Sequence, residues 1–276
     1  AKDNIVAWCI VPFDGKKRGP VERAAMLSNM GLKRVAYDWR EEHVPSFEEE
    51  IEQYKAHGIE YFAFWGVHDE ALRLFEKHGL HPQIWLMLPQ PQAESQNEKV
   101  VEAAEQLLPT LQRLHEQGCQ LGIYNHGGWS GEPANMAAIC DYLNKEHDVK
   151  NVGIVYNFHH GHEHLATFAD DFAKMKPHLL CINLNGMTES ADAIGRKIMP
   201  LGHGQLDVEL LRTIQTSGYR GPIGIIGHTQ DDVEQRLLDN LDGLEWIVNQ
   251  LKGNPAGPRP ELRIPIPSPN EKVAGD

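Results

Sequence analysis

Long apolar runs are missing from this sequence of 276 residues, and basic residues are in the minority. No stretch reaches the roughly 18 apolar residues that a membrane-spanning helix needs, so we expect no insertion into a bilayer. The 26 Lys and Arg residues are outnumbered by 39 Asp and Glu residues, which gives a net charge of −13. Because phosphate backbones and anionic lipids select basic surfaces, we expect neither nucleic acid nor a membrane as a partner.

Cysteine is also scarce. The four cysteines, Cys9, Cys119, Cys140 and Cys181, match no CxxC metal or redox spacing. Three of them lie in or beside apolar runs, where a free thiol packs as a small hydrophobic group. A chain long enough to bury a sizeable core has little need of a disulfide framework. We therefore expect buried structural thiols.

The start of the chain carries no signal-peptide pattern, and its first residue is Ala1 rather than Met. We therefore expect that the natural start was altered, either by removal of a leader or by a replaced first segment. We expect a soluble protein that is cytoplasmic or, if a leader was removed, periplasmic or secreted.

Short apolar runs alternate with helical segments along the chain, which is typical of βαβ units and a parallel sheet. The strand-like runs cover residues 5–11, 34–39, 59–65, 82–88, 119–124, 151–156, 179–184 and 222–227. The helical segments cover residues 20–31, 46–58, 69–79, 98–117, a stretch from 133 onward, 164–175, 207–218 and 231–251.

Eight strand–helix units in one chain predict an α/β fold of the (β/α)8 TIM barrel type, which takes about 250 residues. Closure into a barrel removes both edges of the sheet. An open, doubly wound sheet is the alternative. At the local level, Ser46 with Glu49 three residues later predicts a capping box at the start of a helix.

The end of the chain differs in composition from the rest. We expect a single barrel domain over residues 1–252 and an extended, proline-rich tail over residues 253–276. Such a segment is either disordered or packed along a neighbour. In the second case the tail would support a homo-oligomer.

The turns after the predicted strands are rich in His and Asn, whereas the opposite strand ends hold ordinary helix–strand turns. Barrels of this type place their working site at the C-terminal ends of the strands, so the contrast between the two faces predicts a site there. The rim residues that we single out are Asp38, Arg40, Trp65, Tyr124, Asn125, His126, Asn157, His160, Asn183, Asn185, His203 and His228.

Several of these residues also have a structural interpretation. Trp65 is either a core aromatic or a platform for a sugar ring. Asp38 and Arg40 could simply pair with each other across the rim. Of the His run over residues 159–164, one or two members should point inward, and His160 is the choice because it lies three residues after the strand end at Asn157.

Five motifs carry a family resemblance over residues 5–251. They are IYNHGGW with its following Glu-Pro, VGIVYNFHHGH, CINLNGM, LGHGQLD and GPIGIIGH. With them the chain resembles the xylose-isomerase-like barrel superfamily, which includes sugar-phosphate isomerases and epimerases. The resemblance implies a (β/α)8 barrel and a carbohydrate ligand.

The resemblance also implies a divalent metal held by four side chains at the ends of strands five to eight, typically Glu, Asp, His and Glu. The matching positions here are Tyr124, Asn157, Asn183 and Gly227. None is a good ligand for a divalent cation, and no carboxylate remains to offset its charge. We therefore expect no metal. The alternative is zinc or manganese at a rearranged site of His126, His160 and His228, since three His with an open fourth position is a known zinc arrangement.

Together these features predict a carbohydrate-active isomerase, epimerase or lyase that moves a proton next to a carbonyl. Imidazole titrates near neutral pH, so His126 and His160 are the candidate acid and base, with His228 as a third candidate. The remaining rim residues would bind substrate, and Arg40 or Lys197 could meet an anionic group.

Three other functions stay open. A non-catalytic carbohydrate-binding barrel would keep the same rim without turnover, and a metal-dependent enzyme would use the rearranged His site. An endonuclease-like barrel is opposed by the acidic charge and the missing carboxylates.

Overall fold

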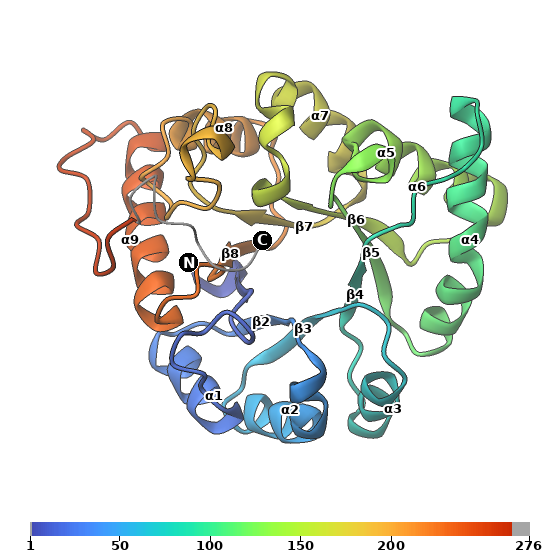
Figure 1. The fold of residues 1–276 in the computed structure, drawn as a ribbon, viewed down its shortest axis with the longest axis horizontal. Coiled ribbons are helices and arrows are strands. Elements are labelled where there is room, and N and C mark those ends of the chain that lie inside the picture. The colour runs from blue at the N-terminus through green and yellow to red at the C-terminus, as the bar shows by residue number, and fades with distance from the viewer. Residues whose placement is uncertain (1, 267–276) are drawn as a thin grey trace.

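The computed structural model describes residues 2–266 as a closed barrel of eight parallel strands (Figure 1). The strands pair in chain order, and β1 also pairs with β8. Closure confirms the predicted barrel and excludes the open sheet. The strands are β1 (Ile5–Trp8), β2 (Arg34–Tyr37), β3 (Glu60–Trp65), β4 (Gln83–Leu86), β5 (Gln120–Tyr124), β6 (Val152–Asn157), β7 (Leu179–Leu184) and β8 (Ile223–Ile226).

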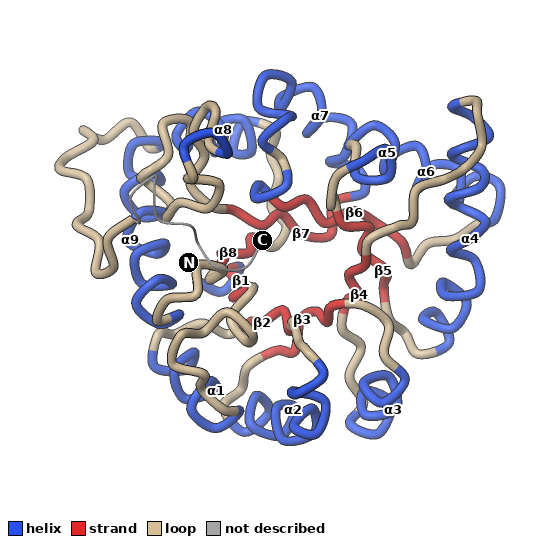
Figure 2. The backbone as a smooth tube through the Cα atoms, in the orientation of Figure 1, coloured by secondary structure: helices blue, strands red, loops and turns tan. Residues whose placement is uncertain are grey.

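Helices surround the barrel (Figure 2). The α-helices are α1 (Pro20–Asn29), α2 (Phe47–Ala56), α3 (Asp69–His78), α4 (Gln96–Glu116), α5 (Gly128–Gly131), α6 (Pro133–His147), α7 (Phe168–Met175), α8 (Asp207–Thr216) and α9 (Val233–Leu251). The short 3₁₀ helices are η1 (Lys2–Asn4), η2 (Glu41–Ser46), η3 (Phe158–His160), η4 (His162–Thr167), η5 (Lys176–His178) and η6 (Asp192–Ile194). Within residues 2–266, no helix is both long and apolar enough to cross a membrane.

The strands bury both faces, because their side chains alternate between the helix layer and the barrel interior. In β1, Ile5 and Ala7 belong to the core under the helices, whereas Val6 and Trp8 belong to a separate interior cluster. All four cysteines are buried and free, as expected.

Two local predictions are wrong. The first strand ends at Trp8 rather than at residue 11, because Cys9 has a left-handed backbone with φ of 56° that extended pairing cannot accommodate. The capping box at Ser46 does not form, since its hydroxyl donates to the carbonyl of His43 instead of receiving a bond from the helix. The turn η2 before the helix supplies this competing acceptor.

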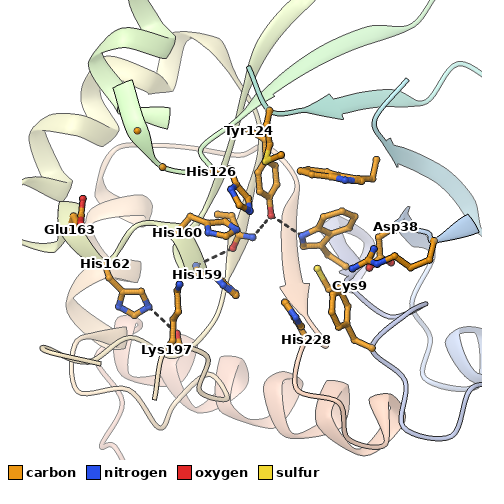
Figure 3. Close-up of a pocket in the computed structure, with 18 residues that line it drawn as sticks. Cys9, Asp38, Tyr124, His126, His159, His160, His162, Glu163, Lys197 and His228 are labelled. Atoms are coloured by element: carbon orange, nitrogen blue, oxygen red, sulfur yellow. Dashed lines mark hydrogen bonds between the residues drawn. The ribbon is translucent and has the colours of Figure 1, made fainter. Parts of the chain in front are cut away.

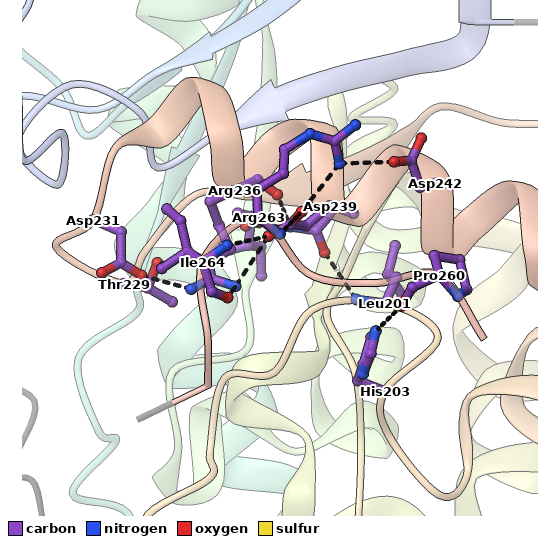
Figure 4. Close-up of polar contacts among 12 residues, drawn as sticks. Leu201, His203, Thr229, Asp231, Arg236, Asp239, Asp242, Pro260, Arg263 and Ile264 are labelled. Atoms are coloured by element: carbon purple, nitrogen blue, oxygen red, sulfur yellow. Dashed lines mark hydrogen bonds and ion pairs between the residues drawn. The ribbon is translucent and has the colours of Figure 1, made fainter. Parts of the chain in front are cut away.

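The described part of the tail contacts α9 of its own barrel (Figure 4). Arg263 pairs with Asp239 and Asp242 of α9 at 3.1 and 2.7 Å. Arg236 of the same helix donates to the carbonyl of Ile264 at 3.3 Å. Residues 267–276 of the predicted tail lie outside the described residues. The domain boundary at residue 252 and a homo-oligomer through the tail stay predictions.

We expect Arg263→Ala to lower the free energy of unfolding by about 1–2 kcal/mol, because it removes a charged donor from Asp239. The Asp239 side chain is fully buried, so water cannot replace that donor. Urea unfolding of the variant measures the loss. Arg73→Ala is the matched control, since it breaks an exposed ion pair with Glu70 that should contribute about 0.5 kcal/mol or less. Equal losses in the two variants would show that the buried ion pair between Arg263 and Asp239 does not stabilise the fold more than an exposed pair.

Candidate functional site

A cavity of about 790 Å³ opens at the C-terminal ends of the strands, where the rim residues were predicted to meet (Figure 3). We call it the bowl. Eight of the predicted site residues line the bowl: Asp38, Arg40, Trp65, Tyr124, His126, Asn157, His160 and His228. Its lining also includes Lys197 and residues that the sequence analysis had not selected: Trp8, Cys9, Phe13, Met87, Gly127, Gly128, His159, His162 and Glu163.

Two of the amides predicted to bind substrate are buried and form hydrogen bonds to the backbone. Asn125 is buried, and its side chain accepts from the backbone N–H of Asn157 at 2.6 Å and donates to its carbonyl at 3.0 Å. Both ends of this amide are therefore used in joining β5 to β6. Asn185 is also buried and donates to the carbonyls of Gly186 and Lys197. Neither amide lines the bowl, and a role of either in binding substrate stays a prediction.

Asn183 and His203 also lie outside the lining of the bowl. Asn183 is fully buried, and its Oδ1 accepts from the thiol of Cys181 at 3.5 Å. His203 contacts the carbonyl of Pro260 at 3.2 Å, so it belongs to the docking of the tail (Figure 4). A contact between residues so far apart in the chain leaves no local pattern in the sequence.

Four imidazoles form a row along one wall of the bowl. The ring centroids of His126 and His160 are 4.2 Å apart, those of His160 and His159 are 4.3 Å apart, and those of His159 and His228 are 5.3 Å apart. Burial and the neighbouring imidazoles lower the pKa of His160 to about 3 and that of His159 to about 2. Both rings are therefore neutral at pH 7, which leaves a ring nitrogen free to accept a proton.

Asp38 and Cys9 also line the bowl, and Figure 3 shows Asp38 across it from His126 and His160. Asp38 is only 3% exposed, and one carboxyl oxygen accepts from the backbone of Val11 at 3.3 Å. The other oxygen has no hydrogen-bond partner among the described residues. Burial raises the pKa of Asp38 to about 7. The expected pair with Arg40 is absent from the described hydrogen bonds and ion pairs, since the Arg40 guanidinium lies over the Phe13 ring at 5.3 Å.

We expect Asp38→Asn to stabilise the protein more at pH 8 than at pH 5. The folded-state pKa of Asp38 is raised from 3.8 to about 7. The contribution of this carboxyl to the free energy of unfolding is therefore fully present below pH 3.8 and is lost as pH rises to about 7. The neutral amide has no such loss. The gain of the variant over wild type should grow by about 2–3 kcal/mol between pH 5 and pH 8, as measured by urea unfolding. A constant difference would show that Asp38 does not titrate in this range.

Tyr124 is the centre of a buried hydrogen-bond network at the end of β5. Its phenol oxygen accepts from the indole N–H of Trp8 at 3.1 Å and from the side-chain amide of Asn157. The Tyr124 ring packs edge-on against Trp65 at a centroid distance of 4.9 Å and lies 5.8 Å from the ring of His160. Burial raises the pKa of the phenol, so it stays protonated at neutral pH.

The family model of xylose isomerase-like TIM barrels matches residues 25–249. The chain belongs to this family. A comparison with curated protein sequences gave no significant match. The family assignment therefore rests on the family model, with the closed barrel in agreement.

Solved structures of xylose isomerase-like barrels are similar in fold at low identity. A 3-keto-D-glucoside 4-epimerase from E. coli is 15% identical with a TM-score of 0.63, covering 90% of this chain and 99% of its own. The IolI protein with a bound zinc atom is 11% identical with a TM-score of 0.65, covering 90% and 99%. A probable 3-DHS dehydratase from Bacillus anthracis is 14% identical with a TM-score of 0.65, covering 88% and 98%.

The usual metal of xylose isomerase-like barrels does not fit the strand ends of this chain. Tyr124 and Asn157 bond each other, Asn183 is fully buried and does not line the bowl, and Gly227 has no side chain. This donor set holds no carboxylate to balance a divalent charge. In the described part of the chain, a group with metal-ligand spacing does occur at Glu48, Glu52 and His78, but none of the three lines the bowl.

The rearranged histidine site is not formed either. A metal site would need one ring nitrogen from each histidine within 4.8 Å of the other two. Among residues 2–266, this criterion is not met by His126, His160 and His228. His159 lies in the row between His160 and His228, which explains the separation. Metal binding by these three histidines stays a prediction.

Proposed function

We propose that this barrel is an isomerase, epimerase or lyase that transfers a proton next to the carbonyl of a sugar or keto-sugar, without the family's usual metal. The observation that carries the proposal is the contact between His126 and His160, two imidazoles 4.2 Å apart in a bowl lined by Trp8, Trp65 and Tyr124. Aromatic faces suit the apolar face of a sugar ring, while the imidazoles suit its acidic C–H.

The two histidines have different surroundings, which suggests different roles. His160 is half-buried and contacts Tyr124, so it is the proposed base that takes the proton from carbon. An enolate forming beside this ring favours the imidazolium, so the pKa of His160 rises as the proton arrives. His126 is exposed and touches His160, so it is placed to exchange the proton with solvent or return it as the acid.

The similar structures support the same reaction class. A 3-keto-D-glucoside 4-epimerase, which by its name acts at the carbon beside a keto group, and a probable 3-DHS dehydratase are similar to this chain in fold. Lys197 and Arg40 line the bowl on an otherwise acidic chain, so an anionic group on the substrate has cationic partners there. Fold likeness does not fix the substrate, so the proposal names a class of reaction.

The test is incorporation of solvent deuterium. The protein in D₂O is incubated with D-fructose, D-psicose and methyl 3-keto-D-glucoside, and proton NMR follows loss of the C–H signals beside each carbonyl. We expect exchange above the buffer rate for at least one compound. Binding of the sugars, seen by calorimetry, with no exchange and no new product would favour the non-catalytic carbohydrate-binding barrel instead.

A further inference from the structure

The phenol of Tyr124 has a hydrogen left to donate. Its oxygen accepts from the Trp8 indole, which can only donate, and from the Asn157 amide. Among the described residues these are the hydrogen bonds of the phenol, and its oxygen accepts in both. Tyr124 lines the bowl although it is only 3% exposed, so this hydrogen is available to a molecule bound there.

The direction of the Asn157 contact is fixed by its neighbours. The Oδ1 atom of Asn157 accepts from the backbone N–H of His159 at 3.1 Å. The NH₂ group must therefore face Tyr124, since reversing the amide would set NH₂ against N–H. Asn125 holds the Asn157 backbone through both its N–H and its carbonyl. Asn125, Asn157 and His159, at or just beyond the ends of β5 and β6, thus impose an acceptor role on the phenol oxygen.

The surroundings also hold the Tyr124 ring in place. The rings of Trp8, Trp65 and Trp85 pack around it at centroid distances of 6.2, 4.9 and 6.3 Å. A donor that needs no rearrangement when charge develops is what stabilises an oxyanion in a dry site. The His160 ring lies beside the same phenol, so a carbonyl oxygen at Tyr124 brings the neighbouring C–H towards the imidazoles.

We propose that Tyr124 donates its hydrogen bond to the carbonyl oxygen of the substrate and stabilises the negative charge that develops there. A Lewis-acid metal would otherwise stabilise this charge, and Tyr124 occupies the strand-five position at which the family usually has a ligand. Trp8 and Asn157 are positioning residues that orient the phenol. This inference rests on the proposed function.

The step balances without any co-reactant. A ring nitrogen of His160 takes the proton from the carbon beside the carbonyl, and the C–H electron pair becomes the new C=C bond. The carbonyl π pair moves to oxygen, where the Tyr124 O–H bonds the resulting enolate and remains protonated. Return of the proton to the same carbon from the other face gives an epimer. Return to the former carbonyl carbon gives an isomer, provided that the hydroxyl proton on the first carbon passes to the enolate oxygen, so that the new carbonyl forms at the first carbon.

The experiment compares Tyr124→Phe with Tyr156→Phe in the deuterium-exchange assay with the same three keto-sugars. Tyr156 is a matched control, since it is a buried tyrosine near the end of the neighbouring strand β6, and its hydroxyl contacts His164 outside the bowl. We expect Tyr124→Phe to lower kcat by about 100- to 1,000-fold with KM within about threefold, which is the effect of removing one oxyanion donor. Tyr156→Phe should keep the wild-type kcat.

The outcomes separate the two proposals. Exchange by wild type with an unchanged kcat in Tyr124→Phe would overturn the role of Tyr124 and leave the proposed function standing. No exchange by wild type with any of the three keto-sugars would overturn both. Circular dichroism establishes that each variant folds. If Tyr124→Phe does not, Trp8→Phe removes one of the two donors that orient the phenol. A smaller fall in kcat in Trp8→Phe supports the role, and an unchanged kcat contradicts it.

Discussion

Replacing His160 by Gln is expected to lower the rate of solvent-deuterium exchange by about 100- to 10,000-fold, because the change removes the proposed base. Gln keeps much of the polar volume of the ring but cannot accept a proton near neutral pH. His160 contacts both His126 and Tyr124, so it lies between the route to solvent and the proposed enolate donor. The rate is measured by NMR on the keto-sugar that wild type exchanges fastest.

Two further variants test whether the loss of exchange is specific to His160. His126→Gln should slow exchange less than His160→Gln, since water can partly replace an exposed relay. His164→Gln is the control, because this histidine contacts Tyr156 and Glu132 and does not line the bowl. If His164→Gln lost as much activity as His160→Gln, the loss would reflect packing of the η3–η4 segment rather than catalysis.

The second large effect is on acid stability. His159 and His160 have folded-state pKa values lowered from 6.5 to about 2 and about 3. Their neutral rings therefore contribute stability that is present above pH 6.5 and is lost as pH falls towards 3. The double variant His159→Gln/His160→Gln has no such loss. Between pH 6.5 and 4.5 it should gain about 4–5 kcal/mol on wild type, since each pKa unit corresponds to about 1.4 kcal/mol.

Urea unfolding at the two pH values measures this gain. The comparison is made within each protein between pH 6.5 and 4.5, so a constant cost of the substitutions cancels. Asp38 works in the opposite direction, since its raised pKa favours the folded state as pH falls, but it is present in both proteins and also cancels. Parallel stability curves for wild type and double variant would contradict buried, neutral imidazoles.

The barrel could be predicted from the sequence because its periodicity is local. Each strand is an apolar run followed by a helix. Single residues also mark helix ends, as Pro20 marks the start of α1. The end of β1 could not be predicted in the same way. Cys9 takes up its left-handed backbone within an apolar run that continues to Val11, so composition gives no sign of the break.

The bowl was predicted less completely than the fold. Tyr124 and Asn125 are neighbours on one strand end, yet alternation sends Tyr124 into the bowl and leaves Asn125 bonded to β6. The position of an amide at a strand end therefore does not show whether its side chain faces the bowl or bonds to the backbone. Trp8 was not selected because it lies in the wholly apolar run over residues 5–11. Its indole N–H donates to Tyr124 across the barrel interior, a contact that leaves no local pattern in the sequence.

Metal content tests most directly the central claim, that the bowl performs proton transfer with side chains alone. Elemental analysis of the untagged protein, before and after chelation, is combined with the deuterium-exchange assay on both samples. The account predicts less than about a tenth of an equivalent of any divalent metal, with exchange unchanged by the chelator. About one equivalent of tightly held zinc or manganese, with activity lost on its removal and restored on its return, would contradict it.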